Sequence, residues 1–278
     1  MYMVRLHLNA YERPDLQKYI LRILFMAPIY STTAFLCLSF PGTTNYISLI
    51  RDCLEAFVIF SFMWFLIEAL GGERVISKTM LHKPQIEMLF PLSFLEPWAM
   101  GFEMFYNCKF GILQFVAVFP FCAAAIFVTA ALGVYEADAW YSTDFWLALL
   151  EFCIAAWAVY CFFMFYFAME QELKDRLRYP LGKVLAVLAV VFFCFFQGVL
   201  LRIVLAISNL PESRMYSAHN AIVSFELWLI CLEMVLFALY VNYNFPVEEF
   251  NKDGEPLLRD DFTRTNPEGT FKTTSTFC

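Results

Sequence analysis

Six long apolar segments constrain this sequence more than any motif in it. A helix needs about 20 apolar residues to cross the hydrocarbon core of a bilayer. Backbone groups in lipid find hydrogen-bond partners only within a helix or a closed barrel. The pattern therefore predicts an all-α polytopic membrane protein, a six-helix transmembrane bundle. The spans lie near residues 20–40, 46–70, 110–134, 145–169, 181–208 and 218–243.

Composition supports a bilayer as the environment of the chain. Of its 278 residues, 61% are hydrophobic and 16% are charged. Soluble domains have about 45–50% apolar and about 25% charged residues. The surplus apolar surface needs lipid around it, because the outside of a soluble domain must face water. The net charge of −7 argues against a nucleic-acid partner, since binding to phosphates requires clustered Lys and Arg.

Basic residues alternate between the two sides of the predicted bundle. The connections on one side are rich in Lys and Arg, whereas those on the other side contain only Arg214. Short cytoplasmic loops carry the excess of basic residues. Both the N-terminus and the C-terminus are therefore predicted to be cytoplasmic. The basic side comprises segments 1–19, 71–109 and 170–183 and the end of the chain, and the other side comprises 41–45, 135–144 and 209–217.

Three segments outside the spans have a distinct composition. Residues 1–19 form a cytoplasmic amphipathic N-terminal segment. Residues 71–109 are apolar but are interrupted by Pro91 and Pro97, which predicts a segment at the membrane interface. Residues 247–278 are polar and acidic, which predicts a disordered cytoplasmic tail.

A few polar residues within the spans are the candidate substrate pathway. Four charged residues should lie roughly 9–14 Å below the outer surface, and a fifth, Glu233, lies one heptad deeper than Glu226 on nearly the same helix face. Their common depth predicts an outward-facing polar cavity, with Arg202 paired to Glu226 or Glu151. Two other interpretations remain open: buried ion pairs that fix helix register, and side chains that reach toward the outer interface. The candidate residues are Glu55, Glu151, Gln197, Arg202, Glu226 and Glu233.

Motifs for catalysis are absent from the sequence. His7, His82 and His219 lack metal-ligand spacing, and there is no glycine-rich phosphate loop or nucleophile elbow. We therefore predict that the protein is not an enzyme and needs neither a cofactor nor a metal. Cys108, beside Lys109 at the expected membrane face, is a candidate acylation site.

Several strings together resemble one family of membrane proteins. They include HLNAYERPDLQKYILRILFMAPIY at the start of the chain, PWAMG and CKFGILQFVAVFP in its middle, and PLGK, FFQGVLLR and LICLEM toward its end. In this order they resemble the organic solute transporter subunit alpha and transmembrane protein 184 family, and they are closer to the transmembrane protein 184 branch. Gln197, Arg202 and Glu233 fall on polar positions that recur in that family. The resemblance implies a seven-helix fold whose first helix would lie upstream of Met1.

The resemblance also implies a function. Members of the alpha-subunit branch transport amphipathic organic solutes without ATP and work with a single-span partner. We therefore expect a transporter of steroid-, bile-acid- or lipid-like solutes, facilitated or ion-coupled, in a eukaryotic plasma membrane or endomembrane. Its partners would be the bilayer, the solute, and a single-span subunit or a second copy of the chain. The carboxylates outnumber Arg202, so cationic or neutral solutes fit more easily than anionic ones. The alternative is a non-transporting receptor or scaffold in trafficking or signalling.

Overall fold

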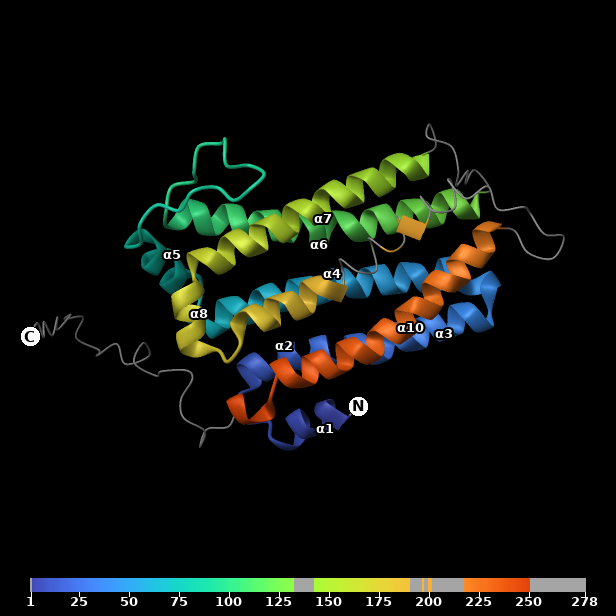
Figure 1. Ribbon diagram of the computed structural model, residues 1–278, viewed down its shortest axis with the longest axis horizontal. Coiled ribbons are helices and arrows are strands. Elements are labelled where there is room, and N and C mark those ends of the chain that lie inside the picture. The colour runs from blue at the N-terminus through green and yellow to red at the C-terminus, as the bar shows by residue number, and fades with distance from the viewer. Residues whose placement is uncertain (1, 133–142, 191–196, 198–199, 202–217, 251–278) are drawn as a thin grey trace, which may run out of the picture.

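The helices of the protein lie side by side in one elongated bundle (Figure 1). The structure is a computed structural model that describes all residues except 1, 133–142, 191–196, 198–199, 202–217 and 251–278. The described residues form α-helices and short 3₁₀ helices and no strand. The elements are α1 (Tyr2–Asn9), α2 (Pro14–Leu24), α3 (Met26–Ser39), η1 (Pro41–Thr43), α4 (Thr44–Ala69), α5 (Glu73–Leu81), α6 (Phe102–Ala131), α7 (Thr143–Ala168), α8 (Glu170–Arg176), α10 (Ala218–Asn244) and η2 (Val247–Phe250).

Four described helical segments are long and apolar enough to cross a membrane: Pro14–Ser39, Phe102–Thr129, Leu149–Ala168 and Val223–Asn244. A fifth arises if Leu49–Ala69 and Glu73–Leu81, which are bent by 66°, count as one span. A shorter apolar helix, Pro180–Val190, covers the start of the predicted span 181–208. Most of the remainder of that span lies outside the described residues. The described chain is thus a multi-pass helical bundle, and the count of six stays a prediction.

The first predicted span consists of two helices that meet at Phe25. α2 begins at Pro14, whose fixed φ suits a first helical position. The backbone N–H of Arg13 donates to the Gln17 side chain at 2.9 Å, which caps this start. Pro28 has no N–H, and its ring would crowd the carbonyl of Leu24 in a continuous helix. The helix therefore breaks one turn before Pro28, whereas α6 continues through Pro120.

Two consecutive glycines turn the chain at the end of α4. Gly71 has φ 88° and Gly72 has φ 95°, a region that side chains with a Cβ rarely adopt. The N–H of Gly72 donates to the Ile67 carbonyl at 2.9 Å, and that of Gly71 donates to the Glu68 carbonyl at 3.0 Å. This pair of bonds is the Schellman motif. It ends α4 and allows α5 to leave at a sharp angle.

Basic side chains bind helix ends at the same end of the bundle as this turn. Arg176 donates to the Ala69 carbonyl at 3.2 Å, and Lys83 donates to the Ala168 carbonyl at 2.6 Å. Both cations lie at helix C-termini, where the helix dipole favours positive charge. Lys109 pairs with Glu73 at 2.5 Å, which joins α6 to α5. These contacts fix the corners formed by α5 and α8.

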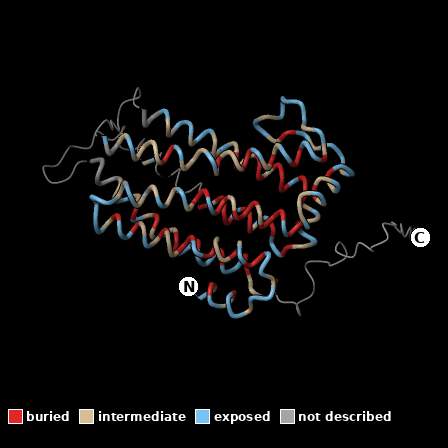
Figure 2. Tube along the Cα trace, turned by 180° about the vertical axis from the view of Figure 1, so that it is seen from behind, coloured by how far each residue is buried: buried red, intermediate tan, exposed pale blue. Residues whose placement is uncertain are grey.

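The buried core lies mainly toward this end of the bundle. Figure 2 shows buried residues concentrated there, while the opposite ends of the described helices are more exposed. Phe62 of α4 packs on Phe162 of α7 with ring centroids 5.8 Å apart. A Cβ on Gly111 would lie 2.3 Å from the Cys161 sulfur, so the glycine lets α6 approach α7 closely.

Three helix bounds of the structure differ from the predicted segments. Residues 102–109 were assigned to the interfacial segment, but they form the first turns of α6. Gly101, at φ 115°, precedes this helix, and Glu103 lies in its first turn, where a negative charge is favoured. The first helical segment long and apolar enough to cross a membrane is Pro14–Ser39, which begins before the predicted start near residue 20. The sequence predicts residues 247–250 as part of the disordered tail, whereas in the structure they form η2, in which Glu249 and Phe250 are buried.

Candidate functional site

A cavity of about 830 Å³ lies between α7, the helix Pro180–Val190 and α10. Small-molecule sites in proteins have volumes of roughly 300–1,000 Å³. The cavity is thus large enough for a lipid- or steroid-sized molecule. Its described lining is Val159, Phe163, Leu185, Leu188, Ala189, Val190, Glu233, Met234, Leu236, Phe237 and Tyr240.

Glu233 is the one charged side chain in this described lining. Its Oε2 atom is buried and has no hydrogen-bond partner among the described residues. A carboxylate oxygen without a partner in apolar surroundings loses the hydrogen bonds that water would supply. Glu226, seven residues earlier on α10, acts on Glu233 by charge repulsion. Glu233 is therefore the group in the cavity that most requires a hydrogen-bond donor or a cation.

The cavity has exposed apolar residues among its lining. Leu185 is 39% exposed, Leu236 is 60% exposed and Tyr240 is 39% exposed. In a membrane bundle, exposed apolar side chains face lipid tails, because only apolar surroundings solvate them favourably. In a bilayer, this part of the lining would contact lipid tails.

Glu55, Glu151, Gln197 and Glu226 are not among the described residues that line this cavity. Glu55 of α4 is buried, and the charges of Asp52, Arg51 and Glu151 act on it. The shared depth of Glu55 and Glu151 below the outer surface stays a prediction. Arg51 pairs with Asp52 at 3.3 Å within the same region.

The predicted cation of the polar cavity cannot be placed. Arg202 lies outside the described residues. The Gln197 amide is buried, and neither its nitrogen nor its oxygen has a hydrogen-bond partner among the described residues. The outward-facing polar cavity with Arg202 paired to Glu226 or Glu151 therefore stays a prediction.

Cys108, the predicted acylation site, is fully buried in α6. It lies near Cys161 of α7, and the close approach of these two helices at Gly111 lies one turn further along. An acyl chain could reach this sulfur only if α6 and α7 separated. Acylation at Cys108 stays a prediction, and the packing of these helices opposes it.

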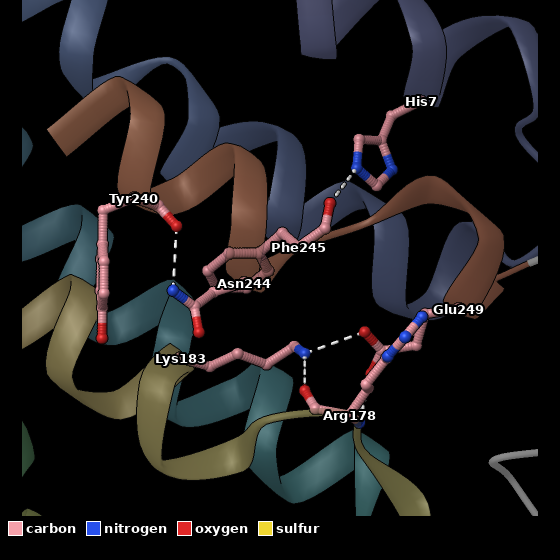
Figure 3. A network of polar contacts seen from close by, with 7 residues as sticks. All are labelled: His7, Arg178, Lys183, Tyr240, Asn244, Phe245 and Glu249. Atoms are coloured by element: carbon pink, nitrogen blue, oxygen red, sulfur yellow. Dashed lines mark hydrogen bonds and ion pairs between the residues drawn. The ribbon is translucent and has the colours of Figure 1, made fainter. Parts of the chain in front are cut away.

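Sequence reasoning missed a buried polar network at the end of the bundle that carries α5 and α8 (Figure 3). Lys183 and Glu249 form an ion pair at 2.8 Å, with side chains 0% and 1% exposed. Lys183 also donates to the Arg178 carbonyl, and the backbone N–H of Arg178 donates to Glu249 at 2.9 Å. Burial raises the pKa of the Glu249 carboxyl, although Lys183 and the Arg178 N–H lower it. The network ties the start of helix Pro180–Val190 to η2.

α10 approaches the same helix closely at Gly182. A Cβ on Gly182 would lie 1.9 Å from the side-chain oxygen of Asn244, so only glycine fits there without a rearrangement. Asn244 itself donates to the Tyr240 carbonyl at 2.9 Å. Tyr240 also lines the cavity. The packing of α10 on helix Pro180–Val190 therefore shapes the cavity as well as the polar network. The PLGK string, which contains Gly182 and Lys183, was the only sequence signal for this arrangement.

His7 connects α1 to the same network. Its Nε2 atom lies 3.1 Å from the Phe245 carbonyl, and its ring lies 5.9 Å from that of Phe250. A carbonyl only accepts, so Nε2 carries the hydrogen. Nδ1 is buried without a hydrogen-bond partner among the described residues. Burial lowers the pKa of His7 from its ordinary value of 6.5, against the opposing effects of the Phe245 bond and the Glu248 charge.

Acidification is expected to weaken the folded state through His7. A lowered folded-state pKa gives a stability contribution that is present above 6.5 and is lost as the pH falls through the folded pKa. The loss is at most about 1.4 kcal/mol per pH unit, the value for one proton. Thermal stability in detergent should fall between about pH 7 and pH 5 for the wild type and less for His7→Gln, which keeps a donor but does not titrate. Identical pH profiles would contradict this role.

The fold and the cavity define an integral multi-pass membrane protein with a solute-sized apolar site. A family model described as Organic solute transporter Ostalpha matches residues 1–250. The chain therefore belongs to this family of solute transporters, as the sequence motifs predicted.

Similar proteins come from a plant and an amoeba. "Protein LAZ1 homolog 1" of Arabidopsis thaliana is 29% identical over 94% of this chain and 56% of its own length, and "Protein LAZ1" of the same plant is 29% identical over 95% and 56%. A "Transmembrane protein 184 homolog" of Dictyostelium discoideum is 28% identical over 88% and 48%. The chain spans about half the length of these relatives. No solved structure matches the chain.

Proposed function

We propose that this protein moves amphipathic organic solutes across a membrane, with the cavity between α7, helix Pro180–Val190 and α10 as the solute site. The observation that carries the proposal is the cavity of about 830 Å³, whose described lining is mainly apolar and contains a single carboxylate, in a member of a solute-transporter family. Steroid-, bile-acid- and lipid-like molecules have the apolar bodies that such a lining binds. Transport would be facilitated or ion-coupled, because the sequence contains no nucleotide-binding motif.

The exposed lining favours entry from the bilayer. Amphipathic solutes concentrate at the membrane interface, where their apolar parts lie among the acyl chains. A solute that enters past Leu185 and Leu236 would reach Glu233 without crossing water. The group around Glu55 and Glu151, with Arg202, would form the outward-facing polar part of the pathway.

The remaining parts of the proposal concern the assembly and its membrane. We place both chain termini in the cytoplasm, on the strength of the basic residues that gather at one end of the bundle. The partner would be a single-span subunit or a second copy of the chain. The membrane would be the plasma membrane or an endomembrane of a eukaryotic cell.

Flux into proteoliposomes tests transport directly. The purified chain would be reconstituted and supplied with a labelled steroid sulfate, a neutral steroid and a long-chain amine, with protein-free liposomes as the baseline. Flux of at least one class above the baseline is expected. If folded protein moves none of them, alone or with a single-span partner subunit, the chain acts as a receptor or scaffold instead.

A further inference from the structure

The described lining of the cavity offers a ligand one charged side chain, a phenol and otherwise apolar contacts. Glu233 belongs to α10 and faces lining residues from α7 and helix Pro180–Val190. No Lys, Arg or His occurs in the described lining. An anionic head group in this space would meet a carboxylate, and the described lining holds no cation that would offset the repulsion.

The Oε2 atom of Glu233 would be stabilised by a hydrogen-bond donor. Oε2 is buried, and no described group donates to it. A protonated amine supplies both the hydrogen bond and the opposite charge, and such charge-assisted bonds are about twice as strong as neutral ones. A neutral hydroxyl would supply only the bond.

The apolar part of the site determines the size and polarity of the ligand body that carries the amine. The lining residues Phe163, Leu188 and Phe237 provide apolar surface deep in the bundle, because Leu188 and Phe237 are buried. The volume of about 830 Å³ accommodates a body the size of a steroid or a long acyl chain. The exposed rim at Leu185 and Leu236 faces the bilayer, in which cationic amphipaths dissolve with their heads at the interface.

From this combination we infer that the cavity selects cationic amphipaths, molecules with one protonated amine on a long apolar body, through an ion pair with Glu233. The inference rests on the proposed function only in naming the class of solute for the same site. Binding to the cavity requires no transport.

Binding measurements with three matched probes test the inference. The probes are radiolabelled dodecylamine, dodecanol and dodecanoate, which share a chain and differ in head-group charge. The full chain would be held in phosphatidylcholine nanodiscs, with the signal from empty nanodiscs subtracted. Dodecylamine is expected to bind at least about tenfold more tightly than dodecanoate, the effect of one buried charge-assisted hydrogen bond.

Substitutions at the carboxylate decide whether Glu233 causes this preference. Glu233→Gln should weaken dodecylamine binding by about tenfold and leave dodecanol binding nearly unchanged. Glu233→Asp keeps the charge and should keep the preference for the amine. Glu68→Gln removes an exposed carboxylate outside the described lining and serves as the control. Equal affinities for dodecylamine and dodecanoate, or a Glu233→Gln variant that still prefers the amine, would overturn the inference.

The binding and flux results separate the two proposals. If dodecylamine binding depends on Glu233 but no solute is transported, the cation site is supported and the transport proposal is wrong. If steroid sulfate is transported and Glu233→Gln does not change its flux, transport is supported. The Glu233 cavity is then not the solute site, and the inference is wrong. If phosphatidylcholine in the nanodiscs occupied the cavity and no probe displaced it, the site would be a lipid site and the inference would be wrong.

Discussion

Lys183→Met alone is expected to lower the free energy of unfolding by about 3–5 kcal/mol, the cost of leaving one member of a buried ion pair without its partner. Both side chains of the pair are almost completely buried. Without the ammonium group, the Arg178 N–H would be the one donor left to Glu249 among the described residues, and the Arg178 carbonyl would lose its bond to Lys183. The loss should appear as a lower unfolding midpoint in detergent and as a smaller free energy in reversible denaturation in mixed micelles.

Two further variants show whether burial is the cause. The double variant Lys183→Met/Glu249→Leu removes both charges and should recover most of the lost stability, because apolar residues of similar size often replace buried pairs without cost. Lys174→Met breaks an exposed pair with Glu170, whose side chains are 58% and 39% exposed, and should cost no more than about 1 kcal/mol. If Lys183→Met cost as little as Lys174→Met, the network would not hold α10 in place.

The sequence predicted the helical bundle because its signals are local. An apolar run of sufficient length must be a helix in lipid, whatever its neighbours are. Pro28 and the Gly71–Gly72 pair act within one turn of themselves, so the break at Phe25 follows directly from the order of residues. The helix starts were less certain: α6 begins at Phe102 because Gly101 lies at positive φ, and the apolar residues around it did not indicate this.

The sites were harder to predict because their residues are distant in the chain. Lys183 and Glu249 are 66 positions apart, and each taken alone is typical of a charged loop. They meet only because the chain after α10 turns back into η2. The depth estimate placed Glu55, Glu151, Arg202 and Glu226 at one level of the bundle, which stays a prediction. It did not reveal that Glu233 lines an apolar cavity, since leucines and phenylalanines that line a cavity look the same in a sequence as those that fill a core.

Ala189→Trp is expected to reduce solute flux by roughly 5- to 150-fold if the cavity is the solute site. Ala189 lies in the cavity lining on helix Pro180–Val190. An indole there occupies space that a bound solute needs, and forcing the two together costs about 1–3 kcal/mol, which corresponds to that range of factors. The variant should still fold, because filling a cavity does not displace packed side chains and often stabilises a protein.

A matched substitution distinguishes the effect of filling the cavity from the effect of adding a tryptophan elsewhere on the bundle. Ala156 lies on α7 outside the described lining, and its side chain is exposed, so Ala156→Trp places the same indole toward the surroundings of the bundle. Flux through Ala156→Trp should equal that of the wild type, with equal amounts of protein in the proteoliposomes and equal unfolding midpoints. Wild-type flux in Ala189→Trp would show that solute crosses the bundle by another path, such as the group around Glu55 and Glu151. A loss of flux in both variants would trace the effect to the added bulk at the helix surface and not to the cavity.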